Sequence, residues 1–250
     1  MDLYLKGKTA VVTGASQGMG RAITKELALE GVKVLATGRN EDLLNSLREE
    51  VVAAGGVGPV ILSQDFMATD AAEKIAAAAF AGLGYVDILV NNAGKSVPLD
   101  VIGADKDWDA SFLLHFDRLR QLTQQFLPQM MERRDGVILN ITSTFELRTI
   151  NASSVAKAAV VVWSKQLAGE LGKYGIRVNN LQPGLIDTEN IRPFFQGGER
   201  QKFASKEIPL GDFGETQDIA NMATFLVSPR ARYVTGTMVG VDGGLRYSAF

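Results

Sequence analysis

The stretch TGASQGMG near the amino terminus constrains this chain more than any other part of its sequence. It follows an apolar run, Thr9–Val12, and it leads into Arg21–Glu30, whose apolar residues recur at helical spacing. Gly14 allows a sharp turn, Gly18 lets backbone N–H groups approach a ligand, and Gly20 lets a helix pack closely on a strand. The N–H groups of a helix N-terminus then favour a phosphate or pyrophosphate. The spacing is looser than G-x-G-x-x-G, so a turn that binds nothing stays open on this motif alone.

Short apolar runs alternate with helical segments along the chain. We expect strands at residues 9–12, 32–36, 60–62, 86–90, 137–141, 176–181 and 237–241, and helices at 21–30, 41–54, 71–80, 106–134 (bent at Pro128), 152–171 and 216–227. Strands that are apolar throughout are typical of a parallel sheet covered on both faces. We expect residues 188–210, with their glycines and prolines, to be irregular. No linker divides the chain, which predicts a single α/β domain over residues 1–250, doubly wound, with helices on both faces of the sheet.

Composition argues against several kinds of partner and site. The net charge is −2 and no basic run exceeds two residues, so nucleic acid is not an expected partner. The chain has no cysteine and one histidine, His115, so we expect no metal centre. The amino terminus lacks the apolar core of a signal peptide, and no apolar run is long enough to span a bilayer. We therefore expect a cytoplasmic protein that does not bind membranes.

Polar residues follow the expected second and third strands, where this architecture places ligands. Gly38 and Arg39 stand where an NAD-binding protein usually has a carboxylate for the adenosine ribose. A carboxylate would repel a 2′-phosphate, whereas a guanidinium can pair with it, so NADP(H) is favoured and NAD(H) is the second option. The alternative is a solvated surface arginine. Asp65 and Phe66 are expected beside the adenine, although Asp65 could instead cap the next helix.

The fourth strand ends in Asn91–Gly94, where small residues admit a ligand and an asparagine amide can bond across to neighbouring strands. An ordinary turn would look the same. Further motifs follow in order: the strand ending Asn140–Ser143, Lys157 within a helix, the Pro183–Gly184 turn and Val241–Gly244. Together they resemble the short-chain dehydrogenase/reductase family over nearly the whole chain. The resemblance implies a Rossmann-type sheet of about seven strands, NAD(P) binding, and a homotetramer or homodimer.

The resemblance also implies which residues meet the dinucleotide and the substrate. Ile186 and Thr188 would meet the nicotinamide carboxamide. Residues 188–210 would form the substrate loop, with Phe194, Phe195 and Phe203 either as an apolar lid or packed against the body or a partner subunit. The full set of expected cofactor contacts is Gly14, Ser16, Gln17, Gly18, Met19, Gly20, Arg39, Asp65, Phe66, Asn92, Ala93, Gly94, Lys157, Pro183, Gly184, Ile186 and Thr188.

The catalytic set of the family is changed in this chain. In the family a serine polarises the substrate oxygen, a tyrosine transfers the proton, and a lysine binds the ribose and lowers the tyrosine pKa, with an asparagine nearby. Ser143 and Lys157 match the serine and the lysine, but Ser153 stands at the tyrosine position and His115 at the asparagine position. An aliphatic hydroxyl is a much weaker acid than a phenol, so Ser153 cannot simply replace the tyrosine. The alternatives are water held by Ser153 and Lys157, the His115 imidazole acting through a relay, and Glu146.

Three functions stay open at this point. An NADP(H)-dependent oxidoreductase of a small carbonyl or alcohol substrate, with a modified proton path, is favoured because Ser143, Lys157 and the phosphate loop are present. The lost tyrosine instead favours a cofactor-binding sensor or structural subunit, or a non-redox lyase or dehydratase. Within the site, His115 could equally be a packed helix residue, and Glu146 a solvated loop carboxylate.

Overall fold

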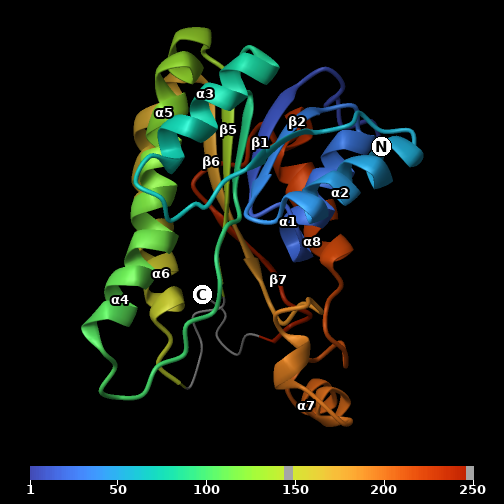
Figure 1. Cartoon of the computed structure of the whole chain (residues 1–250), viewed down its shortest axis with the longest axis vertical. Helices are drawn as coiled ribbons and strands as arrows, with labels where there is room; N and C mark the ends of the chain where they lie inside the picture. Colours follow the sequence, from blue (N-terminus) through green and yellow to red (C-terminus); the bar gives the residue numbers. More distant parts are fainter. Residues whose placement is uncertain (144–148, 246–250) are drawn as a thin grey trace.

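Seven short strands form one parallel sheet in the computed structural model, which describes residues 1–143 and 149–245 (Figure 1). They are β1 (Thr9–Thr13), β2 (Lys33–Gly38), β3 (Val60–Ser63), β4 (Ile88–Asn91), β5 (Gly136–Ile141), β6 (Ile176–Pro183) and β7 (Met238–Val241). Their order across the sheet is β3-β2-β1-β4-β5-β6-β7. The order reverses between β1 and β4, and in sheets of this kind a ligand binds at the carboxyl ends of the strands beside that reversal.

Helices cover both faces of the sheet (Figure 1). The helices are α1 (Gly18–Leu29), α2 (Glu41–Ala53), α3 (Ala71–Leu83), α4 (Asp105–Phe112), α5 (Arg118–Arg133), α6 (Ala152–Leu171), α7 (Glu199–Glu207) and α8 (Thr216–Val227). One apolar core joins α1, α2 and α8 to Val12 and Val90, and a second joins α3, α5 and α6 to Val11 and Leu89. Neighbouring strand residues therefore feed opposite cores, as the pleat of a strand requires. The predicted fold class, a doubly wound α/β domain, is confirmed.

The predicted helix over residues 106–134 is three elements rather than one. α4 is followed by a π turn, Leu113–Asp117, in which the N–H of Arg118 bonds to the carbonyl of Leu113, and then by α5. The departure from α geometry lies at this turn, whereas Pro128 stays inside α5. The extra residue of a π turn changes the direction of the side chains that follow it, and such turns are common at functional sites.

The prediction that residues 188–210 are irregular is wrong in part. The segment contains a 3₁₀ turn, Arg192–Phe194, and the nine-residue helix α7. Its glycines and prolines lie outside α7, with Gly198 at the helix N-cap in a left-handed conformation (φ +87°). The residues between Gly198 and Pro209 are therefore free to form a helix, which buries Ala204. Among the described residues, no helix combines the length and apolarity that a membrane span needs.

Candidate active site

The glycine-rich loop before α1 lies in direct contact with the segment after β4. Gly14 has a positive φ of +66°, and a Cβ atom there would stand 2.9 Å from the Cα of Ala93. A Cβ at Gly20 would lie 2.3 Å from both the Asn92 amide nitrogen and the Gly14 carbonyl oxygen. Only glycine fits at these two positions, because backbone and a held side chain fill the space. The two motifs thus come together as predicted.

Hydrogen bonds lock this contact in place. The Oγ1 of Thr13 accepts the backbone N–H groups of Asn92 and Ala93, both at 3.0 Å. The Asn92 amide donates to the carbonyls of Thr13 at 2.9 Å and Gly14 at 3.1 Å. Asn92 therefore bonds across to the neighbouring strand, as expected for an asparagine here. Its amide positions the loop, and the backbone of the loop is left to meet a ligand.

The N-terminus of α1 fits an anion. The N-cap residue Gln17 makes no side-chain capping bond within the described residues, and the first turn holds no acidic residue. A Cβ at Gly18 would lie 3.5 Å from the Cγ2 of Thr188, and Gln17 donates to the Asn190 side chain at 3.3 Å. Met19, in the same turn, packs on the core. The helix thus presents free N–H groups and the positive end of its dipole beside the segment that follows Thr188.

The carboxyl end of β2 brings Ser16 close to Gly38. A Cβ at Gly38 would lie 3.2 Å from the Ser16 Oγ, and the next residue, Arg39, is exposed and forms no ion pair with any described residue. Asp65 accepts the N–H of Met67 at 3.0 Å in a local turn. The alternative that Asp65 caps the next helix is wrong, because α3 starts at Ala71 with Asp70 as its N-cap residue.

Phe66 packs in the core beside α3, so its side chain belongs to the body of the protein. Its backbone, next to that of Asp65, follows β3 at the carboxyl edge of the sheet. The local turn of Asp65 fixes the path of this segment. Both residues therefore lie at the edge where the sequence predicted a ligand.

The Pro183–Gly184 turn closes the site on its other side. A Cβ at Gly184 would lie 2.6 Å from the Cα of Asp242, so the turn packs directly on the segment after β7. Ile186 and Thr188 are both buried, and Asp187 between them pairs with two arginines from the substrate loop, Arg192 at 2.8 Å and Arg200 at 2.7 Å. These ion pairs hold the loop to the residues predicted to meet the cofactor.

The three phenylalanines of the predicted substrate loop differ in their packing and exposure. Phe195 and Phe203 pack edge-to-face, with ring centroids 5.3 Å apart, and both contact Phe213. Ile208 joins them in a small core. Of the two alternatives for these rings, an apolar lid or packing against the body, the structure therefore shows packing against the body. Phe194 is exposed and remains available for contact with a substrate or a partner.

Lys157, His115 and the end of β5 meet beside Gly94. The Lys157 ammonium donates to the Thr142 carbonyl at 3.1 Å, one residue before Ser143. A Cβ at Gly94 would lie 3.0 Å from the His115 ring and 3.5 Å from Cε of Lys157. Burial lowers the pKa of Lys157 to about 8, well below that of an exposed lysine. The structure thus brings Lys157 and His115 together, beside the strand end that leads to Ser143.

His115 is held by both of its ring nitrogens and is only 1% exposed. Nδ1 lies 2.8 Å from the Ser111 carbonyl, and Nε2 accepts the N–H of Lys95 at 3.1 Å. The neutral ring with its proton on Nδ1 satisfies both contacts. Burial, reinforced by the Lys157 ammonium, lowers the pKa of His115 to about 4. The ring therefore stays neutral near pH 7 and fixes the backbone at Lys95, which fits the packed-residue alternative.

Ser153 belongs to the cap of α6. The N-cap residue Asn151 accepts the Ser153 hydroxyl at 2.6 Å, its backbone N–H at 3.0 Å and that of Ser154 at 3.4 Å. The Asn151 amide also donates to Ser96 at 2.8 Å. Sequence reasoning missed Asn151, although an asparagine directly before a helical pattern is an N-cap signal. Glu146, the remaining candidate for proton transfer, lies outside the described residues.

Comparisons with known proteins agree with this geometry. A family model described as enoyl-(acyl carrier protein) reductase matches residues 14–246. A 3-oxoacyl-[acyl-carrier-protein] reductase of Thermotoga maritima is 34% identical over 250 residues, covering 97% of this chain and 99% of that protein. A 7alpha-hydroxysteroid dehydrogenase of Escherichia coli is 35% identical over 246 residues, covering 97% and 96%. The structure of L-sorbose reductase from Gluconobacter frateurii with NADPH and L-sorbose superposes with a TM-score of 0.94 and 32% identity, covering 99% of this chain and all of that one.

Proposed function

Because the chain belongs to the short-chain dehydrogenase/reductase family, we propose that it is an NADP(H)-dependent enzyme that interconverts a small carbonyl compound and its alcohol through an atypical proton-transfer site. The observation that carries the proposal is the meeting of the glycine-rich loop, Asn92–Gly94, the end of β5 and Lys157 at one edge of the sheet. The similar sorbose reductase binds NADPH and L-sorbose, and a similar 7 alpha-hydroxysteroid dehydrogenase binds NADH and a 7-oxo bile acid. Both carry out chemistry of the proposed class.

The residues at this edge fit a dinucleotide. Gly14 and Gly20 have no room for a side chain, and the uncapped first turn of α1 suits a pyrophosphate. Arg39, together with the nearby Ser16, would hold a 2′-phosphate. Ile186 and Thr188 would meet the nicotinamide carboxamide. When bound, the nicotinamide supplies or accepts a hydride.

The catalytic roles follow from the chemistry of the side chains. The Ser143 hydroxyl would donate a hydrogen bond to the substrate oxygen and polarise the carbonyl. Lys157 would bind the ribose and place its charge beside that oxygen. Ser153 and His115 would keep the helix end and the Lys95 backbone in position, since their hydrogen bonds are already directed there. The proton of the family's tyrosine would then come from another group.

A titration of both cofactors tests the choice of NADP(H). We expect NADPH to bind more tightly than NADH, and Arg39→Ala to weaken NADPH alone by roughly 1.5–3 kcal/mol, the loss of one charge-assisted pair. Arg48→Ala is a matched control, because this arginine lies on α2 and bonds only to Asn45 among the described residues. NADH binding as tight as NADPH binding in the wild type would contradict the preference.

A substrate panel tests the reaction itself. Ketoses, oxosteroids and 3-oxoacyl thioesters represent the carbonyl classes of the similar proteins. We expect at least one to be reduced with loss of NADPH absorbance at 340 nm, on the order of 1–1,000 turnovers per second for a native substrate. Cofactor binding with no turnover would favour a sensor or structural subunit. Turnover with unchanged cofactor absorbance would favour a lyase or dehydratase.

We also propose that the enzyme assembles as a homotetramer or homodimer. The outer face of α6 leaves Val155 and Val162 exposed at 47% and 63%, and Trp163 packs edge-on against Phe116 beside them. Apolar side chains on a helix face that no neighbouring element covers are typical of a subunit contact. Light scattering at micromolar concentration should give a mass of two or four chains, and a monomer alone would contradict this.

A further inference from the structure

We propose that Lys157 is itself the acid that protonates the substrate oxygen during reduction, in the place of the missing tyrosine. The inference rests on the proposed oxidoreductase function and names the proton donor of that same site. It gives the lysine a second role, since it would touch both the cofactor ribose and the reacting oxygen. Three observations on the described residues carry it: Ser153 and His115 direct their protons elsewhere, Lys157 lies at the end of β5, and it forms no ion pair.

The other candidates among the described residues direct their protons away from the substrate. The Ser153 hydroxyl donates to Asn151 at 2.6 Å. The His115 proton on Nδ1 points to the Ser111 carbonyl, and Nε2 is an acceptor for the Lys95 N–H. For His115 to act as a relay, Nε2 would have to gain a proton and lose its backbone partner, leaving the Lys95 N–H unpaired. Neither group offers a proton without breaking a contact that holds the site together.

Lys157 offers a proton at the correct end of the sheet. Among the described residues its ammonium donates one hydrogen bond, to the Thr142 carbonyl at 3.1 Å, which leaves two further N–H groups for a ligand. Thr142 is the residue before Ser143, which is expected to polarise the substrate oxygen. Gly94 on the opposite side has no side chain, and a Cβ there would stand 3.5 Å from Cε of Lys157. A substrate oxygen bound at Ser143 would therefore lie one residue along the chain from the carbonyl that the Lys157 ammonium contacts.

The charges around Lys157 favour release of its proton. Two titratable side chains of the described residues lie on this side of Lys157, His115 of the π turn and Lys95 after β4, and neither carries a negative charge. The acidic residues of α4, which packs on α6, are Asp105, Asp107 and Asp109, and none forms an ion pair with Lys157 in the part of the chain that is described. Burial without a counter-charge lowers the pKa of Lys157 to about 8. An acid of this strength is well matched to proton transfer near neutral pH.

The proposed step balances in atoms and electrons. The carbonyl carbon takes a hydride from bound NADPH, which forms the new C–H bond, while the π electrons of the C=O bond move to oxygen. That oxygen forms its O–H bond with a proton from the Lys157 ammonium, whose N–H bond breaks. The substrate is reduced by two electrons and NADPH is oxidised to NADP⁺. Lys157 is left as a neutral amine that regains a proton from solvent, and oxidation of the alcohol runs through the same steps in reverse.

The test compares wild type, Lys157→Arg, Lys157→Ala and the control Lys165→Arg, an exposed lysine on the same helix. In the wild type, kcat/KM for reduction should fall about tenfold per pH unit above pH 8, because only the ammonium is an acid. Lys157→Arg keeps the charge but cannot release a proton, so it should bind NADPH and lose about 10²–10⁴-fold in reduction. Lys157→Ala should be rescued by added ethylammonium, with a rate proportional to its concentration. Lys165→Arg should leave the pH profile unchanged.

A readout independent of activity completes the test. In protein labelled with ¹⁵N-lysine, the Lys157 side-chain signal, assigned by its loss in Lys157→Arg, should titrate near pH 8. If NADPH is oxidised but Lys157 titrates above pH 10, or Lys157→Arg keeps the wild-type pH profile, the inference is overturned and the proposed function stands. A Lys157→Ala protein that binds NADPH yet gains nothing from ethylammonium overturns it too. If the wild type oxidises NADPH with no carbonyl substrate present, both the proposed function and the inference about Lys157 are contradicted.

Discussion

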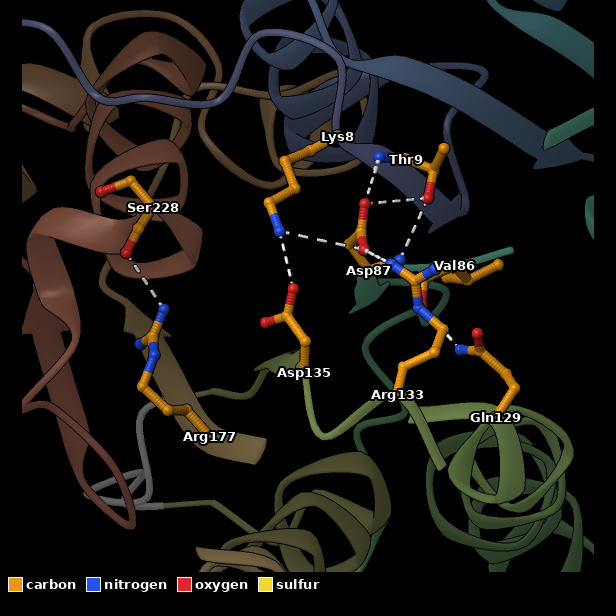
Figure 2. Close-up of polar contacts among 9 residues, drawn as sticks. All are labelled: Lys8, Thr9, Val86, Asp87, Gln129, Arg133, Asp135, Arg177 and Ser228. Atoms are coloured by element: carbon orange, nitrogen blue, oxygen red, sulfur yellow. Dashed lines mark hydrogen bonds and ion pairs between the residues drawn. The ribbon is translucent and has the colours of Figure 1, made fainter. Parts of the chain in front are cut away.

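The two ends of the parallel sheet differ in whether their charged side chains have ion-pair partners. At the amino end, the buried Asp87, 3% exposed, accepts the Thr9 N–H at 2.9 Å and Arg133 at 3.0 Å, and Lys8 bonds to Asp135 at 2.7 Å (Figure 2). At the carboxyl end, Lys157 is half-buried and forms no ion pair with any described residue. Charges that are matched stabilise the fold, whereas an unmatched charge lowers stability and is available for chemistry.

Arg177 strengthens the comparison at the amino end. Its guanidinium donates to the carbonyls of Leu226 at 2.8 Å, Ser228 at 3.1 Å and Val234 at 3.2 Å, and so ties the C-terminus of α8 to the start of β6. Figure 2 draws Arg177 directed at Ser228, apart from the Asp87 cluster. A cation at a helix C-terminus also interacts favourably with the helix dipole. These side chains, Lys8, Asp87, Asp135 and Arg177, line a cavity of about 340 Å³, and each of them has a partner within the protein.

The largest effect should come from breaking the matched end. Asp87→Ala removes the acceptor of two Thr9 groups and of Arg133, so a buried N–H and a cation lose their partner. We expect the free energy of unfolding in urea to fall by about 3–5 kcal/mol, with cofactor affinity per folded molecule unchanged. The control is Asp70→Ala, which breaks the exposed pair with Lys74 and should change little. Equal losses of unfolding free energy in the two variants would contradict a special role of the Asp87 cluster in the stability of the amino end.

The next effect concerns pH at the unmatched end. The pKa of His115 falls from 6.5 to about 4 on folding, so between these values the unfolded chain binds more protons. Stability is therefore fully present above pH 6.5 and decreases as the pH falls, by about 3 kcal/mol at pH 4. His115→Asn should remove this part of the decrease. Unfolding curves of both proteins at pH 7, 5.5 and 4.5 check it, and parallel curves would contradict it.

A gain in stability is expected from removing the unmatched charge. Lys157→Met replaces a half-buried, unpaired ammonium with an apolar side chain of similar length, and should raise the free energy of unfolding at pH 7 by about 1–3 kcal/mol. The pKa of Lys157 is about 8 in the folded chain and 10.5 in a free one, so the gain should shrink as the pH rises from 8 towards 10.5. Thermal unfolding at pH 7 and 9.5 measures it. A loss at pH 7 would show that the charge is matched after all.

The smallest effect sharpens the comparison within the amino end. Asp135→Ala breaks the Lys8 pair at 2.7 Å, but both side chains are partly exposed, at 33% and 47%. Solvent screens such a pair, so we expect a change of less than about 1 kcal/mol in the free energy of unfolding. A loss as large as that of Asp87→Ala would mean that the cluster acts as one unit. Urea unfolding of the single and double variants separates these cases.

The sequence predicted the strands and the edge where ligands bind, for a shared physical reason. Strands buried on both faces must be apolar throughout, which makes them visible in the sequence. The carboxyl ends of parallel strands lie at one edge of the sheet, so Gly14, Gly94 and Ser143 could be assigned to that edge from the sequence alone. The same pattern of apolar runs gave no indication that Asp87 has a structural role. It falls within the expected strand of residues 86–90, yet β4 starts at Ile88, and the partners of Asp87 come from distant parts of the chain.

Local patterns could not separate elements that differ by one residue or one cap. Apolar spacing does not distinguish a π turn from an α-helix, and the structure places His115 of this turn beside Gly94. The role of Ser153 depended on Asn151, whose side-chain oxygen has four donors, one of them from the distant Val97, that only the folded chain brings together. A catalytic motif specifies residue types only. The hydrogen-bond partners of a side chain, such as Asn151 for Ser153, decide where its proton points.

The π turn at Leu113–Asp117 also sets how this region can change length. It holds one residue more than an uninterrupted α-helix would need, so deleting any one of its residues could restore regular bonding. Because the turn accommodates the extra residue locally, such a deletion would leave α4 and α5 facing their present neighbours and would change only the direction of side chains within the turn, that at position 115 among them. The same deletion within α4 or α5 would rotate the residues that follow by about 100°. Aligning this chain to its relatives with a gap outside the turn would therefore compare residues that face different sides of the molecule.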